Sequence, residues 1–525
     1  MSDSRNSLDD WNRQLDNTRD SQRLEAVARR RSKGYRTARE NLDAVCDPDS
    51  FTEYGQLAVA AQRGRRSLEE LRAETPADGV ITGIGSVNEE LFGEEASRAA
   101  IVINDYTVLA GTQGFFHHQK IDRILEVARR RGLPVILFAE GGGGRPGDVD
   151  VKIANSGLTV PTFGTWASLS GVVPRIAVAH GYCFAGNAAL FGSADITVAT
   201  RSSWIGMAGP AMIEGGGLGT FKPTEIGPVE VQAANGVVDL VVEDEAAAAH
   251  AARQLLSYFQ GCLGQGGLEG WAAADQDALR EALPADRRYS YKIRPIIERL
   301  VDEGSFLELR QHYGKSVITG LARLEGRPVG LLANDTRALS GALDAAASEK
   351  AARFLQLLDA FGLPVISLCD TPGFMVGPES EEQAAVRRMS RLFVVGAQVR
   401  TPWLCVFLRK GYGLGAMAMA GGSLHRPDLT VAWPQGEFGA MGLEGAVHLG
   451  FKRELATATE GPERDALFQK LVGDLYDKGK AVEAAAFLEL DAVIDPADTR
   501  SVLVRALRGA KDKGSASPHR FVDTW

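Results

Sequence analysis

Side chains that usually perform catalysis are poorly arranged in this sequence. None of its eight histidines stands in a His-x-x-x-His spacing with an acidic partner. The adjacent His117 and His118 fall on different faces of a helix, which argues against a metal site. The sequence has neither a Gly-x-Ser-x-Gly elbow nor a Gly-x-x-x-x-Gly-Lys-Ser/Thr phosphate loop. Cys183 lies near a glycine turn, and a small buried thiol is a better interpretation of it than a nucleophile.

Two segments of small residues offer main-chain chemistry instead. They are 183–188 (CFAGNA) and 412–418 (YGLGAMA), and each follows an apolar strand and precedes a helix-like segment. Successive amides at a helix N-terminus present free N–H groups, and small side chains let a ligand carbonyl approach them. This is how an oxyanion hole is built. Close packing of a helix on a strand also favours Gly and Ala, but two such segments together favour a reaction with two oxyanions.

The chain repeats itself, and the two segments belong to corresponding places in the repeat. Matches at one separation are Gly132–Ile136 with Gly362–Ile366, Lys120 with Lys350, and Gly181-Tyr182 with Gly411-Tyr412. The motif 194–199 resembles 427–432 at a slightly larger separation, and 47–51 resembles 302–306. Because the order is preserved over so long a period, we expect a duplicated domain and not a solenoid.

The sequence of each copy predicts a helix, then a buried strand, then a glycine turn. In the first copy we expect a helix over 121–131, a strand over 134–139, and a glycine turn over 141–144. A second strand over 173–179, a turn at His180-Gly181, a small-residue segment over 184–190 and a third strand over 196–199 should follow. Short continuous apolar runs are typical of strands buried on both faces. The pattern predicts an α/β fold with parallel strands and helical crossovers.

Length and composition set the domain plan. We expect a charged helical arm over 1–45, a first domain over 46–260, a linker over 261–290 rich in Gly, Ala and Asp, and a second domain over 291–525. A net charge of −9 argues against nucleic-acid binding. Five scattered cysteines, no signal-like start and no long apolar window indicate a cytoplasmic protein without a membrane span. The basic runs 29–31 and 129–131 are expected on solvated helix faces, with docking of a phosphate-rich ligand as the alternative.

Longer motifs resemble a known family. They are 47–51, 107–114, 170–174, 255–258, 302–330, 347–354, 370–374, 409–416, 432–434 and 441–446. Over about residues 30 to 510 the sequence resembles the carboxyltransferases of biotin-dependent acyl-CoA carboxylases. Within that family, 183–190 and 209–217 are most similar to the carboxyltransferase part of single-chain carboxylases with broad or long-chain acyl-CoA specificity.

The resemblance implies a fold, an assembly and sites. It implies two tandem crotonase-like domains of β-β-α spiral units in a homo-hexamer, with coenzyme A on the first domain and biotin on the second. The first pair of oxyanion amides would come from Ala185 and Gly186 and the second from Gly415 and Ala416. The remaining binding residues implied are, on the coenzyme A side, Gly141, Gly142 and Gly143, and, on the biotin side, Thr371, Pro372, Gly373 and Phe374.

The sequence departs from the family pattern at three points. Ala185-Gly186 stands where Gly-Gly is usual, which leaves backbone amides in place. Ala418, at a position that helps to set the acyl pocket, is smaller than in many short-chain members and would leave room for a longer acyl group. The chain has no Met-Lys-Met biotinylation motif, so we expect biotin to arrive on a partner, a biotin carboxylase or biotin carboxyl carrier subunit.

Two other functions remain open at this level. A decarboxylase subunit of a biotin-dependent pump would run the same chemistry backwards. A non-catalytic scaffold of a carboxylase complex is disfavoured, because glycine turns are intact in both halves. A crotonase-type hydratase is disfavoured as well, because no suitably placed pair of glutamates is present.

Overall fold

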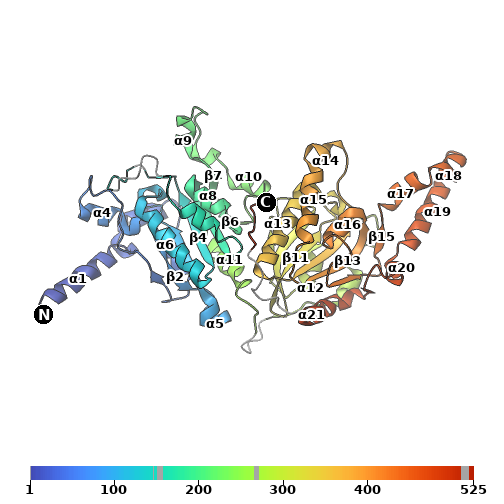
Figure 1. The fold of residues 1–525 in the computed structure, drawn as a ribbon, viewed down its shortest axis with the longest axis horizontal. Coiled ribbons are helices and arrows are strands. Elements are labelled where there is room, and N and C mark those ends of the chain that lie inside the picture. Colours follow the sequence, from blue (N-terminus) through green and yellow to red (C-terminus); the bar gives the residue numbers. More distant parts are fainter. Residues whose placement is uncertain (1, 146, 151–157, 265–270, 510–519) are drawn as a thin grey trace. The chain divides into compact units, whose positions relative to one another are not determined.

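The computed structural model describes residues 2–145, 147–150, 158–264, 271–509 and 520–525. The chain forms two compact units, Met1–Gly261 with His519–Thr524, and Cys262–Pro518 with Trp525 (Figure 1). Each unit contains one eight-stranded sheet. In the described residues, no helix is both long and apolar enough to cross a bilayer.

The first sheet has the strand order β1-β2-β3-β4-β5-β6-β8, and β7 pairs with β5 off this path. Pairing of β1 with β2 and of β2 with β3 is antiparallel, and the later pairs are parallel. The strands are β1 (Thr52–Glu53), β2 (Val80–Ser86), β3 (Arg98–Asn104), β4 (Val135–Gly141), β5 (Arg175–Phe184), β6 (Ile196–Thr200), β7 (Trp204–Gly206) and β8 (Leu240–Val242).

The second sheet repeats this plan strand for strand. Its order is β9-β10-β11-β12-β13-β14-β16, with β15 paired to β13. The strands are β9 (Leu307–Leu309), β10 (Val317–Leu324), β11 (Arg327–Asn334), β12 (Val365–Thr371), β13 (Trp403–Tyr412), β14 (Leu429–Ala432), β15 (Glu437–Gly439) and β16 (Ala492–Val493). The duplication and the α/β class predicted from the sequence are therefore confirmed.

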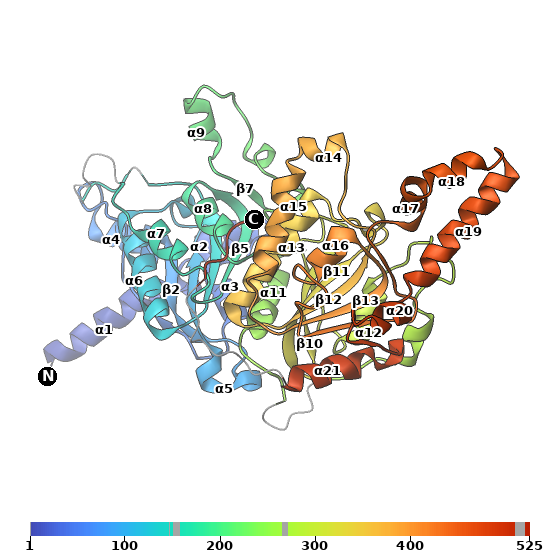
Figure 2. The same ribbon diagram turned by 45° about the vertical axis from the view of Figure 1, so that its right-hand side comes forward.

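Helices cover each sheet (Figure 2). In the first unit they are α1 (Ser2–Asp16), α2 (Leu24–Arg31), α3 (Ala38–Val45), α4 (Leu68–Glu74), α5 (Glu89–Ser97), α6 (Phe115–Arg131), α7 (Thr162–Ala167), α8 (Gly186–Gly192), α9 (Pro210–Gly215), α10 (Val229–Ala234) and α11 (Glu245–Ser257). In the second they are α12 (Arg294–Leu300), α13 (Ala345–Phe361), α14 (Pro378–Glu382), α15 (Ala385–Gly396), α16 (Gly413–Met419), α17 (Leu443–Gly450), α18 (Lys452–Thr457), α19 (Pro462–Lys478), α20 (Ala481–Ala486) and α21 (Thr499–Gly509).

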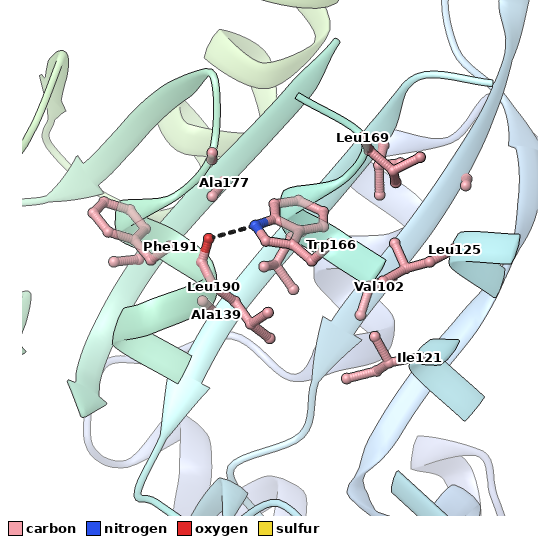
Figure 3. Packing of buried hydrophobic residues seen from close by; sticks show 14 of the residues in the cluster. Val102, Ile121, Leu125, Ala139, Trp166, Leu169, Ala177, Leu190 and Phe191 are labelled. Atoms are coloured by element: carbon pink, nitrogen blue, oxygen red, sulfur yellow. Dashed lines mark hydrogen bonds between the residues drawn. The ribbon is translucent and has the colours of Figure 1, made fainter. Parts of the chain in front are cut away.

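The first core lies between the sheet and α6, α7 and α8. Trp166 of α7 is buried, and its indole N–H donates to the carbonyl of Leu190 in α8 at 2.9 Å (Figure 3). Ile121 and Leu125 of α6 pack in the same cluster. Apolar residues at helical spacing thus hold α6 on the sheet, as the sequence predicts.

Two predicted boundaries differ from the structure. His180 and Gly181 do not turn, because β5 continues through them to Phe184 and exchanges its partner β6 for β7 on the way. The stretch 271–290 packs with the second unit, where Leu279 of the short 3₁₀ helix Asp277–Glu281 is buried in the core cluster. Most of the glycine-rich stretch before it lies outside the described residues. Residues 2–45 contain the helices α1, α2 and α3.

Candidate active site

The first of the predicted sites lies where β5 ends and α8 begins. Ala185 has φ 52° and ψ −120°, a conformation that side chains disfavour, and it caps the helix. Its N–H donates to the carbonyl of Gly206 at 3.0 Å, so the prediction that Ala185 supplies a free amide is wrong. Among the described residues, no acceptor is found for the N–H groups of Gly186, Asn187 and Ala188. These are the unpaired donors that open a helix.

The second site lies where β13 ends and α16 begins. Gly413, with φ 57°, makes the turn. In the part of the chain that the structure describes, no backbone carbonyl outside α16 accepts from the N–H groups of Leu414, Gly415 and Ala416. Gly415 and Ala416 are buried, whereas Leu414 is exposed. Both residues predicted for the second site therefore stand in the first turn of the helix.

Strand register fixes which residues of the two halves correspond. Tyr182 pairs with Trp204 of β7, and Lys410 pairs with Glu437 of β15. Phe184 therefore corresponds to Tyr412 and Ala185 to Gly413, which places Asn187 opposite Gly415 in the repeat. The sequence match of Gly181-Tyr182 with Gly411-Tyr412 is out of register, because similar residue types repeat along both strands.

The predicted coenzyme A turn lies against the start of α8. Gly141 has φ 127°, and a methyl group on it would lie 2.1 Å from the carbonyl oxygen of Gly111. The carbonyl of Gly143 accepts from the N–H of Gln113 at 3.0 Å. A methyl group on Gly143 would lie 3.0 Å from the side chain of Ala185. The structure thus brings Gly141, Gly142 and Gly143 together with the helix start, as the motif positions suggest.

The predicted biotin turn lies against the start of α16. Thr371 ends β12, and its hydroxyl accepts from the N–H of Gly373 at 3.2 Å. The carbonyl of Gly373 accepts from the N–H of Leu343 at 3.0 Å. A methyl group on Gly415 would lie only 2.6 Å from the carbonyl carbon of Gly373. Only glycine allows this contact, so the turn and the free amides of α16 form one compact structure.

A cleft of about 550 Å³ opens beside α16. Its lining includes Gly413, Ala416, Met417, Phe438 and Phe487. Ala418 is fully buried and does not line this cleft.

Comparison with known proteins decides the family. The model of the carboxyl transferase domain matches residues 29–523. The chain belongs to the carboxyl transferase family. It is 32% identical over 502 residues to the methylmalonyl-CoA carboxyltransferase 12S subunit of Propionibacterium freudenreichii subsp. shermanii, covering 94% of this chain and 92% of that protein. It is also 32% identical over 497 residues to the biotin-dependent long chain acyl-coenzyme A carboxylase beta4 subunit of Mycobacterium tuberculosis, covering 93% and 91%.

Solved structures agree with this assignment. A single-chain, multi-domain long-chain acyl-CoA carboxylase superimposes with a TM-score of 0.90 at 54% identity, over 95% of this chain and 48% of that one. This chain therefore spans about half the length of that protein. The transcarboxylase 12S structure with methylmalonyl-coenzyme A bound gives a TM-score of 0.80 at 30% identity, over 95% and 94%. The chain is a carboxyltransferase of the biotin-dependent acyl-CoA carboxylases, built from two tandem crotonase-like domains.

Side-chain nucleophiles are poorly placed in this carboxyltransferase. Burial raises the pKa of the Cys183 thiol, which is fully buried. Burial and the charge of Arg145 lower the pKa of His118 to about 4. Within the described ranges, no group of three or more His, Cys, Asp or Glu side chains could hold a metal ion. The carboxyltransferase thus offers its free amides as the candidate reactive groups.

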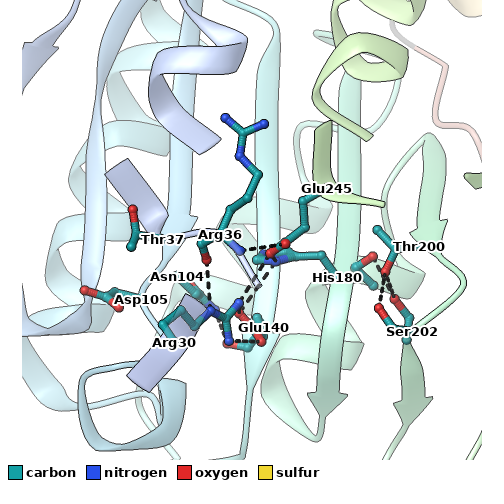
Figure 4. Close-up of polar contacts among 12 residues, drawn as sticks. Arg30, Arg36, Thr37, Asn104, Asp105, Glu140, His180, Thr200, Ser202 and Glu245 are labelled. Carbon is teal, nitrogen blue, oxygen red and sulfur yellow. Dashed lines mark hydrogen bonds and ion pairs between the residues drawn. The ribbon is translucent and has the colours of Figure 1, made fainter. Parts of the chain in front are cut away.

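A buried charge network of the carboxyltransferase was missed by sequence reasoning (Figure 4). Arg30 was expected on a solvated face, but it is buried and donates to Glu140 at 2.8 and 2.7 Å. Its guanidinium also lies 3.4 Å from Glu245, which accepts from His180 at 2.9 Å. Glu140 in a buried strand next to the glycine turn was the available signal, because a buried carboxylate requires a partner. The run 129–131 is exposed, as expected.

Proposed function

We propose that this carboxyltransferase moves CO₂ from carboxybiotin, a substrate carried on another protein, to the α-carbon of an acyl-CoA. Both reactants carry negative charge on one oxygen during the transfer, and backbone amides hold each oxygen. The free N–H groups that open α8 and α16 support this proposal. Preorganised donors of this kind act where charge develops, and removal of one typically costs about 10²–10³ in rate.

The chemistry needs no protein base. Cleavage of the N1′–CO₂ bond leaves the electron pair on the ureido group of biotin. That group then takes the α-proton of the acyl-CoA, and the thioester becomes an enolate. The enolate carbon attacks CO₂ and forms the new C–C bond. The protein holds the two oxyanions and positions the two reactants, which supplies much of the rate increase.

We assign the backbone N–H donors of each half to one of the two oxyanions. In the first half, Gly186 and Asn187 hold the thioester oxygen of the acyl-CoA, with Gly141 to Gly143 lining the coenzyme A site. This assignment replaces Ala185, whose amide is occupied. In the second half, Gly415 and Ala416 hold the ureido oxygen.

The biotin pocket and the acyl pocket follow from the same assignment. Thr371, Pro372, Gly373 and Phe374 shape the biotin pocket, because this turn lies directly on Gly415. Ala418 does not line the cleft beside α16. We assign it to the acyl pocket from the position that it holds in the family pattern, where a small residue leaves room for a longer acyl group. The long-chain substrate of the 54% identical carboxylase is consistent with such a group.

Partners follow from the same chemistry. We infer a biotin carboxylase or carboxyl carrier subunit as the protein that brings carboxybiotin. We also infer a homo-hexamer, since the transcarboxylase 12S structure is a hexamer assembly. The cytoplasm is the compartment that we propose from the cysteine content and the sequence start. The decarboxylase direction would use the same groups. A scaffold without activity is disfavoured, because both halves keep free amides at the helix start.

The test is the reverse reaction of the purified chain. Free biotin is added to malonyl-CoA, methylmalonyl-CoA and longer carboxylated acyl-CoAs, and release of CO₂ is measured. We expect biotin-dependent decarboxylation of at least one substrate. An intact oligomer without activity on any of them would contradict the proposal.

A further inference from the structure

One buried side chain links the two parts of the first site. Asn187, the residue after Gly186 in α8, is 0% exposed. Its Nδ2 lies 3.0 Å from the carbonyl oxygen of Gly142, 3.2 Å from that of Gly111 and 3.3 Å from that of Glu140. One NH₂ group therefore faces three carbonyl oxygens at the base of the glycine turn.

The oxygen of the same carboxamide is also hydrogen-bonded. Asn187 Oδ1 accepts from Asn104 Nδ2 at 2.6 Å and from Gln113 Nε2 at 2.9 Å. Gln113 is itself tied to the turn, because its N–H donates to the carbonyl of Gly143. With donors and acceptors on both sides, the orientation of the carboxamide is determined.

In the second half, the helix start contacts its turn without a side chain between them. Gly415 occupies the corresponding place in α16, and the turn at Gly373 contacts it directly. In the first half, the side chain of Asn187 extends from the helix and donates to the turn at Gly142. The carboxamide is therefore a spacer peculiar to the first half, and its length fixes the distance from the free amides of α8 to the glycine turn.

We propose that Asn187 is a positioning residue whose carboxamide sets the glycine turn for coenzyme A against the amides of α8. This inference rests on the proposed function, which assigns the first half to the acyl-CoA. It predicts that loss of the side-chain donor weakens acyl-CoA use and leaves biotin use unchanged.

The decisive comparison is between Asn187→Ala and Asn187→Asp. Aspartate has nearly the same shape as asparagine but no N–H, so it would place an oxygen against three carbonyl oxygens. A residue that only fills space would tolerate aspartate better than alanine. A donor that holds the turn would tolerate aspartate worse, because unpaired buried acceptors and a buried charge are both costly.

The experiment measures the reverse decarboxylation with both substrates varied. We expect KM for the carboxylated acyl-CoA to rise about tenfold in Asn187→Ala and about 100-fold in Asn187→Asp, with KM for free biotin within about twofold. Asn41→Ala is the matched control, since Asn41 is equally buried but lies in α3 away from the turn. Thermal unfolding is followed for all three, and Asn187→Ala carries the test if the aspartate variant does not fold.

Two results would overturn the positioning role. One is an acyl-CoA KM in both Asn187 variants that matches Asn41→Ala, and the other is a rise in the KM for biotin alone. Calorimetry with coenzyme A separates this role from the proposed function. If the wild type decarboxylates nothing, yet coenzyme A binds and the Asn187 variants weaken its binding, the proposed function fails and the positioning role stands.

Discussion

The two halves of the carboxyltransferase share their framework and differ at their sites. Asp47 accepts from the N–H of Glu89 at 2.9 Å and from Arg253 at 2.8 Å, and Asp302 accepts from the N–H of Gly326 at 2.7 Å and from Arg500. Each aspartate precedes the first strand of its sheet and accepts from the connection between the second and third strands. Duplication has preserved the groups that fix the backbone.

The residues near the sites have diverged. In the first half the rings of Tyr182 and Trp204 are in tilted contact, with 5.1 Å between their centroids, and Lys410 and Glu437 occupy these places in the second half. Asn187 is replaced by Gly415. One scaffold thus presents a helix start twice, with different side chains around it in each copy. Under the proposed function, these differences adapt each copy to a different reactant.

The largest expected effect concerns the buried ion pairs beside each turn. Arg30→Ala leaves Glu140 buried without its partner in the first half, and Arg409→Ala does the same to Asp370 in the second. We expect each change to cost about 3–5 kcal/mol, the usual cost of an orphaned buried charge. Chemical denaturation measures it. A loss below about 1 kcal/mol in only one variant would show that the halves do not depend on these pairs alike.

Gly415→Ala should affect the second half strongly. The added methyl group would lie 2.6 Å from Gly373 and 3.0 Å from the N–H nitrogen of Phe374. Because both contacts are backbone, the turn has to move, and we expect decarboxylation to fall by about 10²–10³. Gly192→Ala in α8 is the control, with no atom near the added methyl group. Equal activities of the two variants would mean that this contact does not shape the site.

The buried lysines Lys120 and Lys350 hold corresponding places in the two halves, so the pH dependence of folding stability can be compared between them. Lys120 donates to the carbonyls of Ala77 and Val80, and Lys350 to those of Tyr313 and Val317. Burial lowers the pKa of Lys120 from 10.5 to about 8. Between these values the unfolded chain binds more protons than the folded one, so folding stability rises with pH.

We therefore compare the wild type with Lys120→Met. Above about pH 8 the free energy of unfolding of the wild type should rise relative to that of Lys120→Met. The rise should level off above about pH 10.5 and reach roughly 3 kcal/mol at most. Denaturation at a series of pH values measures the shift. A difference that stays flat over this range would contradict the lowered pKa. Lys350→Met, measured in the same way, shows whether its pair of carbonyl bonds stabilises the second half as strongly.

The smallest effect comes from exchanging the turn residues. Ala185 adopts φ 52°, where its counterpart in the second half is Gly413. Ala185→Gly should stabilise the first half by about 1 kcal/mol, because strain at a positive φ is removed. Gly413→Ala should destabilise the second, since the new methyl group would also lie 2.9 Å from the carbonyl of Ala440. Melting curves that moved both variants in the same direction would refute the correspondence.

Much of the framework was predictable from the sequence. The constant separation and preserved order of the repeated motifs revealed the duplication. Short apolar runs located β4 and β6, and apolar residues at helical spacing located α6. The small-residue segments located both helix starts, because main-chain chemistry needs glycine and alanine there.

What the sequence could not predict was set by tertiary contacts. The bond from Ala185 to Gly206 depends on β7, which adds to β5 only in the folded sheet. The burial of Arg30 depends on Glu140 and Glu245, far along the chain. Asn187 drew no attention because a single asparagine among small residues carries no periodic signal.

The proposed mechanism depends most on free main-chain N–H groups, and an ester in place of one amide tests it directly. Lactic acid introduced at position 416 replaces the N–H of Ala416 by oxygen and keeps the methyl group. We expect decarboxylation to fall by about 10²–10³ with stability retained. The same replacement at Ala185, whose N–H is bonded to Gly206, should cost about 1 kcal/mol of stability and leave the rate nearly unchanged. A position-416 ester as active as the wild type would contradict the account.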